Sequence, residues 1–238
     1  MTNTLFIGKV YRQVAELPST NDYARELCTK NKPAEGTVVR ADSQSAGRGQ
    51  FGSRWESEPG KNLLLSIILY PVWLRVSDQF RLSEAVALAV RDTVFDAFEF
   101  AEKTAPRISV KWPNDICIDG RKTAGILIQN TLKGEMLDTA IVGIGLNVNQ
   151  LAFPGALPNA TSVGLAADAF FDLDVQMHRL FGHLEQRYLQ LKNGKTKALR
   201  AAYHNHLLGL GELRSFLRAD GTPFQGKIEG VAPDGRLM

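Results

Sequence analysis

The sequence is poor in cysteine and has no cluster of metal-ligating residues. Cys28 and Cys117 are the only cysteines among 238 residues, and neither belongs to a Cys-x-x-Cys pair or to a Cys/His group with metal-ligand spacing. We therefore expect two free thiols, as is usual in a reducing cytoplasm, and neither a disulfide framework nor a metal held by side chains.

The chain also lacks a strong net charge and a long apolar run. Lys plus Arg number 28 and Asp plus Glu 25, which gives a formal net charge of +3. That excess is too small to predict a DNA-binding protein, which would carry a concentrated basic face. The first residues do not resemble a signal peptide, and no window approaches a membrane span. We expect a cytoplasmic protein without a membrane segment.

The apolar pattern predicts how strands and helices follow one another. Apolar residues make up 44% of the chain and charged residues 22%, as in a globular protein with a sizeable core. Short turns at Asp119-Gly120 and Lys133-Gly134 join antiparallel neighbours. We therefore expect an α+β fold whose mixed, largely antiparallel sheet is covered by helices. The expected strands are 5–14, 36–41, 62–70, 108–112, 116–118, 123–128 and 137–147, and the expected helices begin at Ser19 or span 77–100, 175–191 and 196–208.

The end of the chain has a different pattern. Strand-like pieces at 212–217, 226–231 and 236–237 are separated by turns that contain Asp-Gly. This spacing is typical of a small β-barrel, although the pieces are too few to close one. We therefore divide the chain into a large domain, 1–209, and a partial barrel, 210–238.

A glycine-rich stretch, residues 44–55, is the first candidate site. Gly47, Gly49 and Gly52 permit backbone conformations that side chains forbid, so backbone amides can approach an oxygen-rich ligand. Arg48 adds a permanently charged fork for carboxylate or phosphate. The spacing also fits a dinucleotide-binding motif, but no helical pattern follows it, which excludes that interpretation. Taken alone, the stretch would also suit a flexible surface turn.

Two further clusters lie on the expected sheet. Residues 111–115, Lys-Trp-Pro-Asn-Asp, combine an aromatic face, a rigid turn and an amide that can pair with a heterocycle edge. The Asp119-Gly120 turn brings Lys122 back toward this cluster. Lys122 is then either a solvated hairpin charge or a cation that points into a site. The glycine-containing strand end at 143–149 is a weak signal by itself.

Several motifs stand in a fixed order along the chain. They are Ser19-Thr20-Asn21, Gln44-x-Ala46-Gly47-Arg48-Gly49-x-x-Gly52-x-x-Trp55, Lys111-Trp112-Pro113-Asn114-Asp115, Arg121-Lys122-x-Ala124-Gly125-Ile126-Leu127 and Gly143-Ile144-Gly145-Leu146-Asn147. In order and spacing they resemble the biotin–protein ligases, over residues 5–238. The resemblance implies the ligase catalytic fold, which is like that of class II aminoacyl-tRNA synthetases. It also implies an SH3-like barrel cut short after Met238, and a form without the DNA-binding domain that precedes the ligase domain in some members.

The resemblance implies a two-step reaction. Biotin and ATP, with Mg²⁺, give biotinyl-5′-adenylate, and the biotinyl group then passes to a lysine of a biotin carboxyl carrier domain, such as that of acetyl-CoA carboxylase. Biotin and ATP are substrates, and no tightly bound prosthetic group is expected. A homodimer is possible. The first step brings two anions together, so cations and backbone donors are its main requirement.

The resemblance also assigns candidate site residues. Lys122 and Arg48 are the expected catalytic cations. The biotin-binding candidates are Ser19, Thr20, Asn21, Gln44, Gly47, Arg48 and Gly125, and the adenylate or ATP-binding candidates are Gly49, Gln50, Trp55, Lys111, Asn114, Lys122 and Asn147.

One departure and several rival readings accompany this assignment. Gln50 stands where many members of the family carry a second arginine, so one loop cation is absent. A lipoate–protein ligase or octanoyltransferase would share the fold, but its histidine-containing glycine-rich signature is missing. A biotin-responsive repressor disagrees with the small net charge. The presence of Lys122 argues against a catalytically weak biotin-binding module, although the shortened tail leaves that alternative open.

Overall fold

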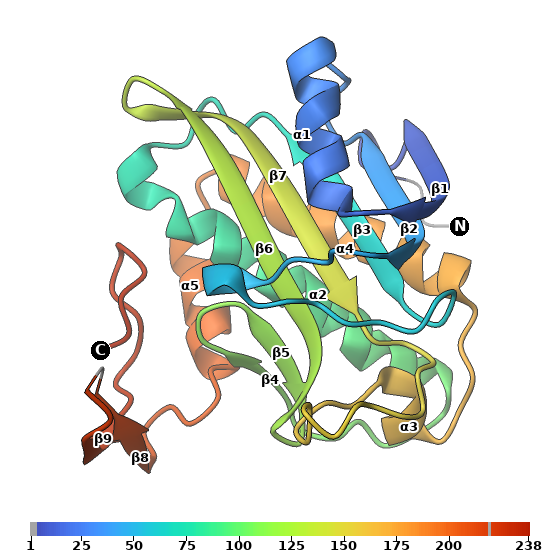
Figure 1. Ribbon diagram of the computed structural model, residues 1–238. Coiled ribbons are helices and arrows are strands. Elements are labelled where there is room, and N and C mark those ends of the chain that lie inside the picture. Colours follow the sequence, from blue (N-terminus) through green and yellow to red (C-terminus); the bar gives the residue numbers. More distant parts are fainter. Residues whose placement is uncertain (1–3, 219) are drawn as a thin grey trace.

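The computed structural model describes residues 4–218 and 220–238, and its centre is one large β-sheet (Figure 1). The sheet has seven strands in the order β1-β2-β3-β7-β6-β5-β4. Its strands are β1 (Tyr11–Leu17), β2 (Val38–Gln44), β3 (Leu63–Leu69), β4 (Ile108–Lys111), β5 (Asp115–Ile118), β6 (Arg121–Lys133) and β7 (Met136–Leu146). The helices are α1 (Thr20–Lys30), α2 (Phe80–Phe100), α3 (Val163–Ala167), α4 (Leu173–Lys192) and α5 (Thr196–Asn205).

The strand directions confirm a mixed, mostly antiparallel sheet. β1 pairs with β2 in parallel, and every other neighbouring pair in this sheet is antiparallel. Positive φ angles at Asp119 (47°) and Gly120 (79°) form the tight hairpin turn that the sequence predicts between β5 and β6. β6 is longer than expected, because Gln129, Asn130 and Thr131 interrupt the apolar pattern but still pair with β7.

The strand expected at 5–14 is wrong in its first half. β1 begins at Tyr11, and residues 5–10 before it form bends and turns. The carboxylate of Glu185 accepts hydrogen bonds from the backbone N–H groups of Leu5, Phe6 and Ile7, at 2.6, 2.8 and 3.0 Å. These three donors converge on one side chain, so they are unavailable to a strand partner. Burial of Ile7 explains why this turn looks strand-like in the sequence.

One face of the sheet, here called the back face, carries the main core. α2 and α4 pack together behind the sheet, and α5 lies beside them (Figure 1). Leu63, Leu65, Ile67 and Leu69 are alternate residues of β3, and all four belong to this core. Because successive side chains of a strand point to opposite faces, Leu64, Ser66 and Ile68 lie on the other side.

The opposite face, here called the front face, is covered differently. α1 packs over part of it and closes a smaller cluster that includes Ala24, Val39 and Ile68. The loop that follows β2 crosses in front of β6 and β7 (Figure 1). Between α1 and this loop, β7 presents Gly143 and Gly145 instead of large side chains, which leaves room above the sheet.

The end of the chain forms a small separate sheet. β8 (Leu213–Leu217) pairs with β9 (Pro223–Lys227), and an isolated bridge joins Val231 to Leu237. No closed barrel forms within the described residues, so the partial barrel stays a prediction. The indole N–H of Trp112 donates to the carbonyl of Gly235 at 2.9 Å, which ties the tail to the large domain. No helix in the described part of the chain combines the length and apolar composition that a bilayer span needs.

Candidate active site

A pocket of about 310 Å³ opens on the front face of the sheet, and residues of α1 and of the loop that follows β2 line it. The uncharged polar groups at the start of α1 and the cations of later segments share this pocket. Its lining residues are Ser19, Thr20, Asn21, Gln44, Arg48, Gly49, Gln50, Ser53, Arg54, Trp55, Lys111, Trp112, Pro113, Asn114, Asp115, Lys122, Gly125, Ile126, Leu127, Gly143, Ile144 and Gly145.

The start of α1 supplies the uncharged polar groups. Ser19 is the N-cap, and its hydroxyl accepts a long hydrogen bond from the backbone N–H of Asp22 (3.4 Å). The backbone N–H of Thr20 donates to Oε1 of Gln44 at 2.7 Å. Because that N–H can only donate, the amide oxygen of Gln44 must face it, and the amide nitrogen Nε2 must face away from the N–H of Thr20. Gly47 lies against this nitrogen, since a Cβ there would be 3.2 Å from Nε2.

The indole ring of Trp55 packs against glycines of the sheet. A Cβ at Gly145 would come within 2.4 Å of the indole ring, and one at Gly125 within 2.9 Å. Both strands must therefore carry glycine where the ring approaches them. Indole Nε1 of Trp55 is buried and has no hydrogen-bond partner among the described residues.

The glycine-rich stretch folds as a hairpin. The N–H of Gly49 donates to the carbonyl of Ser53 at 2.7 Å, and the N–H of Trp55 donates to that of Gly47 at 3.0 Å. A 3-10 turn, η1 (Gln50–Gly52), closes the hairpin. The guanidinium of Arg48 pairs with the carboxylate of Asp22 at 3.0 Å, so the hairpin is connected to the first turn of α1.

Lys122 lies at the pocket. Its ammonium is 2.7 Å from Oδ1 of Asp115 and 5.5 Å from the centre of the Trp55 ring. A register shift in β5 between Ile116 and Cys117 accompanies the pairing of Cys117 with Lys122. The backbone of Lys122 is also held in place, since its N–H donates to the carbonyl of Asn159 at 2.7 Å. Of the two readings that the sequence left open, the geometry agrees with a cation directed at the pocket.

Cations dominate the charge of the pocket. Those that line it are Arg48, Arg54, Lys111 and Lys122, and Asp115 is the one carboxylate among its described lining residues. Such a surface suits an anionic substrate or a reaction that gathers negative charge. No group of three or more His, Cys, Asp or Glu side chains with metal-binding geometry occurs in the described ranges.

The structure brings most of the candidate site residues together. Gly47 lines an adjoining hollow, beside Leu127 and Gln129, and not this pocket. Asn147 is 4% exposed, does not line the pocket, and donates its amide N–H to the carbonyl of Thr161 at 3.1 Å. Cys117 pairs with Lys122 across β5 and β6, and burial raises the pKa of its thiol to about 11.

Several residues that line the pocket are not among the candidates that the sequence predicts. Arg54 lines the pocket and lies two residues after Gly52. Its positive charge within the glycine-rich stretch is a sequence signal for a residue that could bind an anion. Ile126, Leu127 and Ile144 are apolar strand residues that read equally well as core. Only the three-dimensional position of the pocket distinguishes them.

Comparisons with known proteins agree with this geometry. Residues 14–147 match the sequence model of the Biotin/lipoate A/B protein ligase family, so the chain belongs to that family. The bifunctional ligase/repressor BirA of Bacillus subtilis is 35% identical over 96% of this chain and 68% of that protein. The biotin–acetyl-CoA-carboxylase ligase of Paracoccus denitrificans is 34% identical, over 94% of this chain and 92% of that protein.

The similarity extends to solved structures. The biotin protein ligase of Aquifex aeolicus, solved in complex with biotin and ATP, superposes with a TM-score of 0.79 and 26% sequence identity. The superposition covers 96% of this chain and 90% of that one.

Proposed function

We propose that this protein activates biotin with ATP to biotinyl-5′-AMP and transfers the biotinyl group to a lysine of a biotin carboxyl carrier domain, such as that of acetyl-CoA carboxylase. The observation that carries this proposal is the convergence of separate chain segments on one pocket. Uncharged hydrogen-bonding groups at the start of α1 meet cations from the loop and from β4 to β6 there. That combination suits a neutral ring at one part of the ligand and phosphates at another.

The uncharged groups are the proposed biotin-binding residues. Thr20, Asn21 and Gln44 lie together at the start of α1 and the end of β2. The ureido ring of biotin offers two N–H donors and one carbonyl acceptor, and short neutral side chains can pair with all three. Lipoate carries a dithiolane ring in place of this urea, so it would leave such groups unpaired, which a buried site does not tolerate well.

The proposed first step joins two substrates without a protein nucleophile. A carboxylate oxygen of biotin attacks the α-phosphorus of ATP, a C(O)O–P bond forms, and the P–O bond to pyrophosphate breaks. Negative charge grows on the phosphoryl oxygens, so fixed cations lower the barrier. Lys122 and Arg48 are the proposed cations, and each is already held by a carboxylate, Asp115 or Asp22. The substrate oxygens then replace those carboxylates as partners.

The proposed second step transfers the acyl group. The neutral amine of the carrier lysine attacks the acyl carbon of biotinyl-5′-AMP, the C–O bond to AMP breaks, and the amine loses a proton. We assign Gly49, Gln50, Trp55, Lys111 and Asn114 to the adenylate part of the pocket. Asn114 is well placed to stay rigid, since its amide donates to the carbonyl of Ile126 at 2.7 Å.

Magnesium would enter this reaction with ATP. Mg²⁺ keeps several waters and is commonly bound through one or two carboxylates together with substrate phosphates. Asp115 fits that donor set, because it lines the pocket. When bound, the ion would neutralise phosphate charge. We further propose that residues 1–209 form the catalytic domain, that 210–238 are part of a barrel-like domain, and that the reaction takes place in the cytoplasm.

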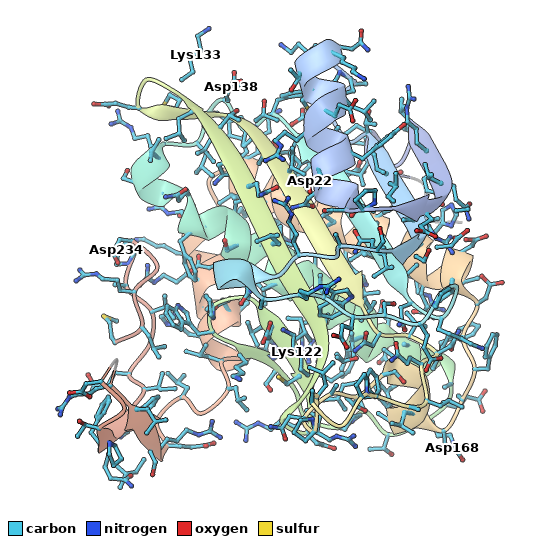
Figure 2. The ribbon with its side chains drawn as sticks, in the orientation of Figure 1. Asp22, Lys122, Lys133, Asp138, Asp168 and Asp234 are labelled. Atoms are coloured by element: carbon cyan, nitrogen blue, oxygen red, sulfur yellow. The ribbon has the colours of Figure 1, made fainter. Side chains whose placement is uncertain are left out.

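The test measures pyrophosphate release from ATP with biotin or lipoate as the acid. The wild-type protein should release pyrophosphate with biotin and not with lipoate. Lys122→Ala should lose on the order of 100-fold or more in this rate, as for loss of one oxyanion donor, while it still binds biotin. Lys133→Ala is the matched control, because this lysine lies at the opposite end of β6 (Figure 2), and it should behave like wild type.

The possible results separate the candidate functions. Equal turnover with lipoate would replace the biotin assignment by a lipoate ligase of the same family. Biotin binding without pyrophosphate release would indicate a binding module. A Lys122→Ala variant with the wild-type rate would reduce Lys122 to a hairpin charge.

A further inference from the structure

Ser66 is a buried hydroxyl in the centre of the sheet, just beneath the pocket. Its exposed fraction is 0%, and it does not line the pocket. The other residues of β3 are leucine and isoleucine. A buried hydroxyl is costly unless it is hydrogen-bonded, so its partners decide what it does here.

Two polar side chains of the pocket contact Ser66. Its Oγ is 2.8 Å from Oγ1 of Thr20 and 2.6 Å from Oδ1 of Asn21. The orientation of Asn21 is fixed independently, because its Nδ2 donates to the backbone carbonyl of Leu127 at 3.2 Å. That carbonyl can only accept, so the amide nitrogen must face it and the amide oxygen must face Ser66.

A hydroxyl has one proton, and this decides the direction of both bonds. Oδ1 of Asn21 can only accept, so the proton of Ser66 points to it. Oγ of Ser66 is then left as an acceptor for Thr20. The proton of Thr20 is consequently used inside the protein, and Oγ1 of Thr20 turns lone pairs toward the pocket. Thr20 is thereby fixed as an acceptor.

Gln44 has the opposite polarity. Its Oε1 is occupied by the backbone N–H of Thr20, at 2.7 Å, so its Nε2 remains as a donor. An acceptor and a donor, each fixed by a hydrogen bond within the protein, thus both belong to the lining of the pocket. A cyclic urea presents the complementary pair, an N–H beside a carbonyl oxygen.

We infer that Ser66 is a positioning residue that sets the specificity of the site for a ligand with a ring N–H, by holding Thr20 as a hydrogen-bond acceptor. The inference rests on the proposed function, because it takes the ureido ring of biotin as that ligand. Ser66 does not touch the ligand and acts through Thr20.

The test compares biotin with two cyclic carbamates, in each of which a ring oxygen replaces one ureido N–H. Isothermal titration gives the dissociation constant of each ligand. Wild type should bind biotin on the order of 100-fold more tightly than the carbamate whose oxygen faces Thr20, because two acceptors then meet. In Ser66→Ala the proton of Thr20 is free to turn toward that oxygen. The preference for biotin should then fall about 10-fold.

Three further variants separate positioning from a general structural role. Ser109→Ala removes another buried serine hydroxyl of the same sheet, one with no hydrogen-bond partner among the described residues, and should leave the preference unchanged. In a Thr20→Val background, Ser66→Ala should have no further effect on the preference. Ser66→Cys retains a weaker donor and should give an intermediate preference, which also guards against poor folding of the alanine variant.

The outcomes are distinct. If Ser66→Ala weakens biotin and carbamate by the same factor, Ser66 has a structural role alone and the inference is overturned. If it lowers the preference equally with and without Thr20, the effect does not pass through Thr20, and the inference is again overturned. Wild type that binds no biotin would remove the proposed function itself, a result recognisable before any variant is made.

Discussion

The two faces of the sheet use the same strands for opposite purposes. On the back face, β3 contributes Leu63, Leu65, Ile67 and Leu69 to the main core. On the front face, the same strand contributes Ser66 to a polar network beneath the pocket. β7 does likewise, with apolar residues such as Val142 behind the sheet and glycines in front of it. One face of the sheet serves stability, and the other gives up large strand side chains so that Asn21 and Trp55, which line the pocket, can approach the strand backbone.

This division explains why the site is built on strands and not on loops alone. Strands fixed from behind by two long helices cannot move easily, so the groups on their front are held in place. The glycines cost stability, since they pack no side chain, but they let Trp55 lie against the strand backbone. The firm back face compensates for this loss.

Substitutions on the back face should therefore lower mainly the stability of the fold, and substitutions on the front face mainly the rate of adenylation. Leu65→Ala should lower the free energy of unfolding by about 2–5 kcal/mol, because it leaves a cavity in the core. Gly145→Ala should change it by about 1 kcal/mol or less, yet its Cβ would displace Trp55 and lower the adenylation rate by on the order of 10- to 100-fold. Urea denaturation and pyrophosphate release measure the two effects.

Two results would contradict this division between a back face that stabilises the fold and a front face that serves adenylation. A normal adenylation rate in Gly145→Ala would mean that the position of Trp55 on its glycines is irrelevant to the reaction. Loss of adenylation in Leu65→Ala at temperatures where the protein is still folded would mean that the back face does more than support the sheet.

The sequence predicts where strands and helices lie better than it predicts which face of the sheet carries the site. The continuous apolar run of β3 indicates a strand buried on both sides, but Ser66 carries no sign of which side holds a ligand. The hairpin at Asp119-Gly120 was predictable because positive φ angles favour those residue types. The turns before β1 were not, because they depend on Glu185, a residue far along the chain. The Asp119-Gly120 turn predicts that Lys122 lies near residues 111–115, but the pairing of Lys122 with Asp115 depends on side-chain packing.

Glu84 in α2 is a buried carboxylate behind the sheet. It is 2% exposed, and burial raises its pKa to about 7, against the opposing effect of Arg200 and Arg81. The unfolded value is 4.5. Folding therefore favours the protonated form, and the contribution of Glu84 to stability is fully present below pH 4.5 and is lost as pH rises through 7.

Replacing Glu84 should reveal this cost. Glu84→Gln should be more stable than wild type by about 2–3 kcal/mol at pH 8 and equally stable near pH 4.5, since each pKa unit corresponds to about 1.4 kcal/mol. Thermal or urea unfolding across this pH range measures it. Glu99→Gln, an exposed site on the same helix, is the control and should show no such pH dependence. Parallel stability curves for Glu84→Gln and wild type would mean that Glu84 is solvated despite its burial.

The smallest expected effect belongs to the front face, at Gln50. This residue lines the pocket within the turn that closes the glycine-rich hairpin, and it is neutral. It cannot offer the charge-assisted fork that arginine gives phosphate. Arg48 and the backbone donors remain, so adenylate should form at a normal rate, but Gln50→Arg should retain biotinyl-5′-AMP longer. A partly exposed contact of this kind contributes about 1 kcal/mol, so release should slow several-fold.

The measurement preloads both proteins with biotinyl-5′-AMP and follows its release without a carrier. Gln225→Arg, which adds the same charge on the exposed tail, controls for net charge. Equal release from Gln50→Arg and wild type would show that the hairpin holds the adenylate through its backbone and Arg48 alone.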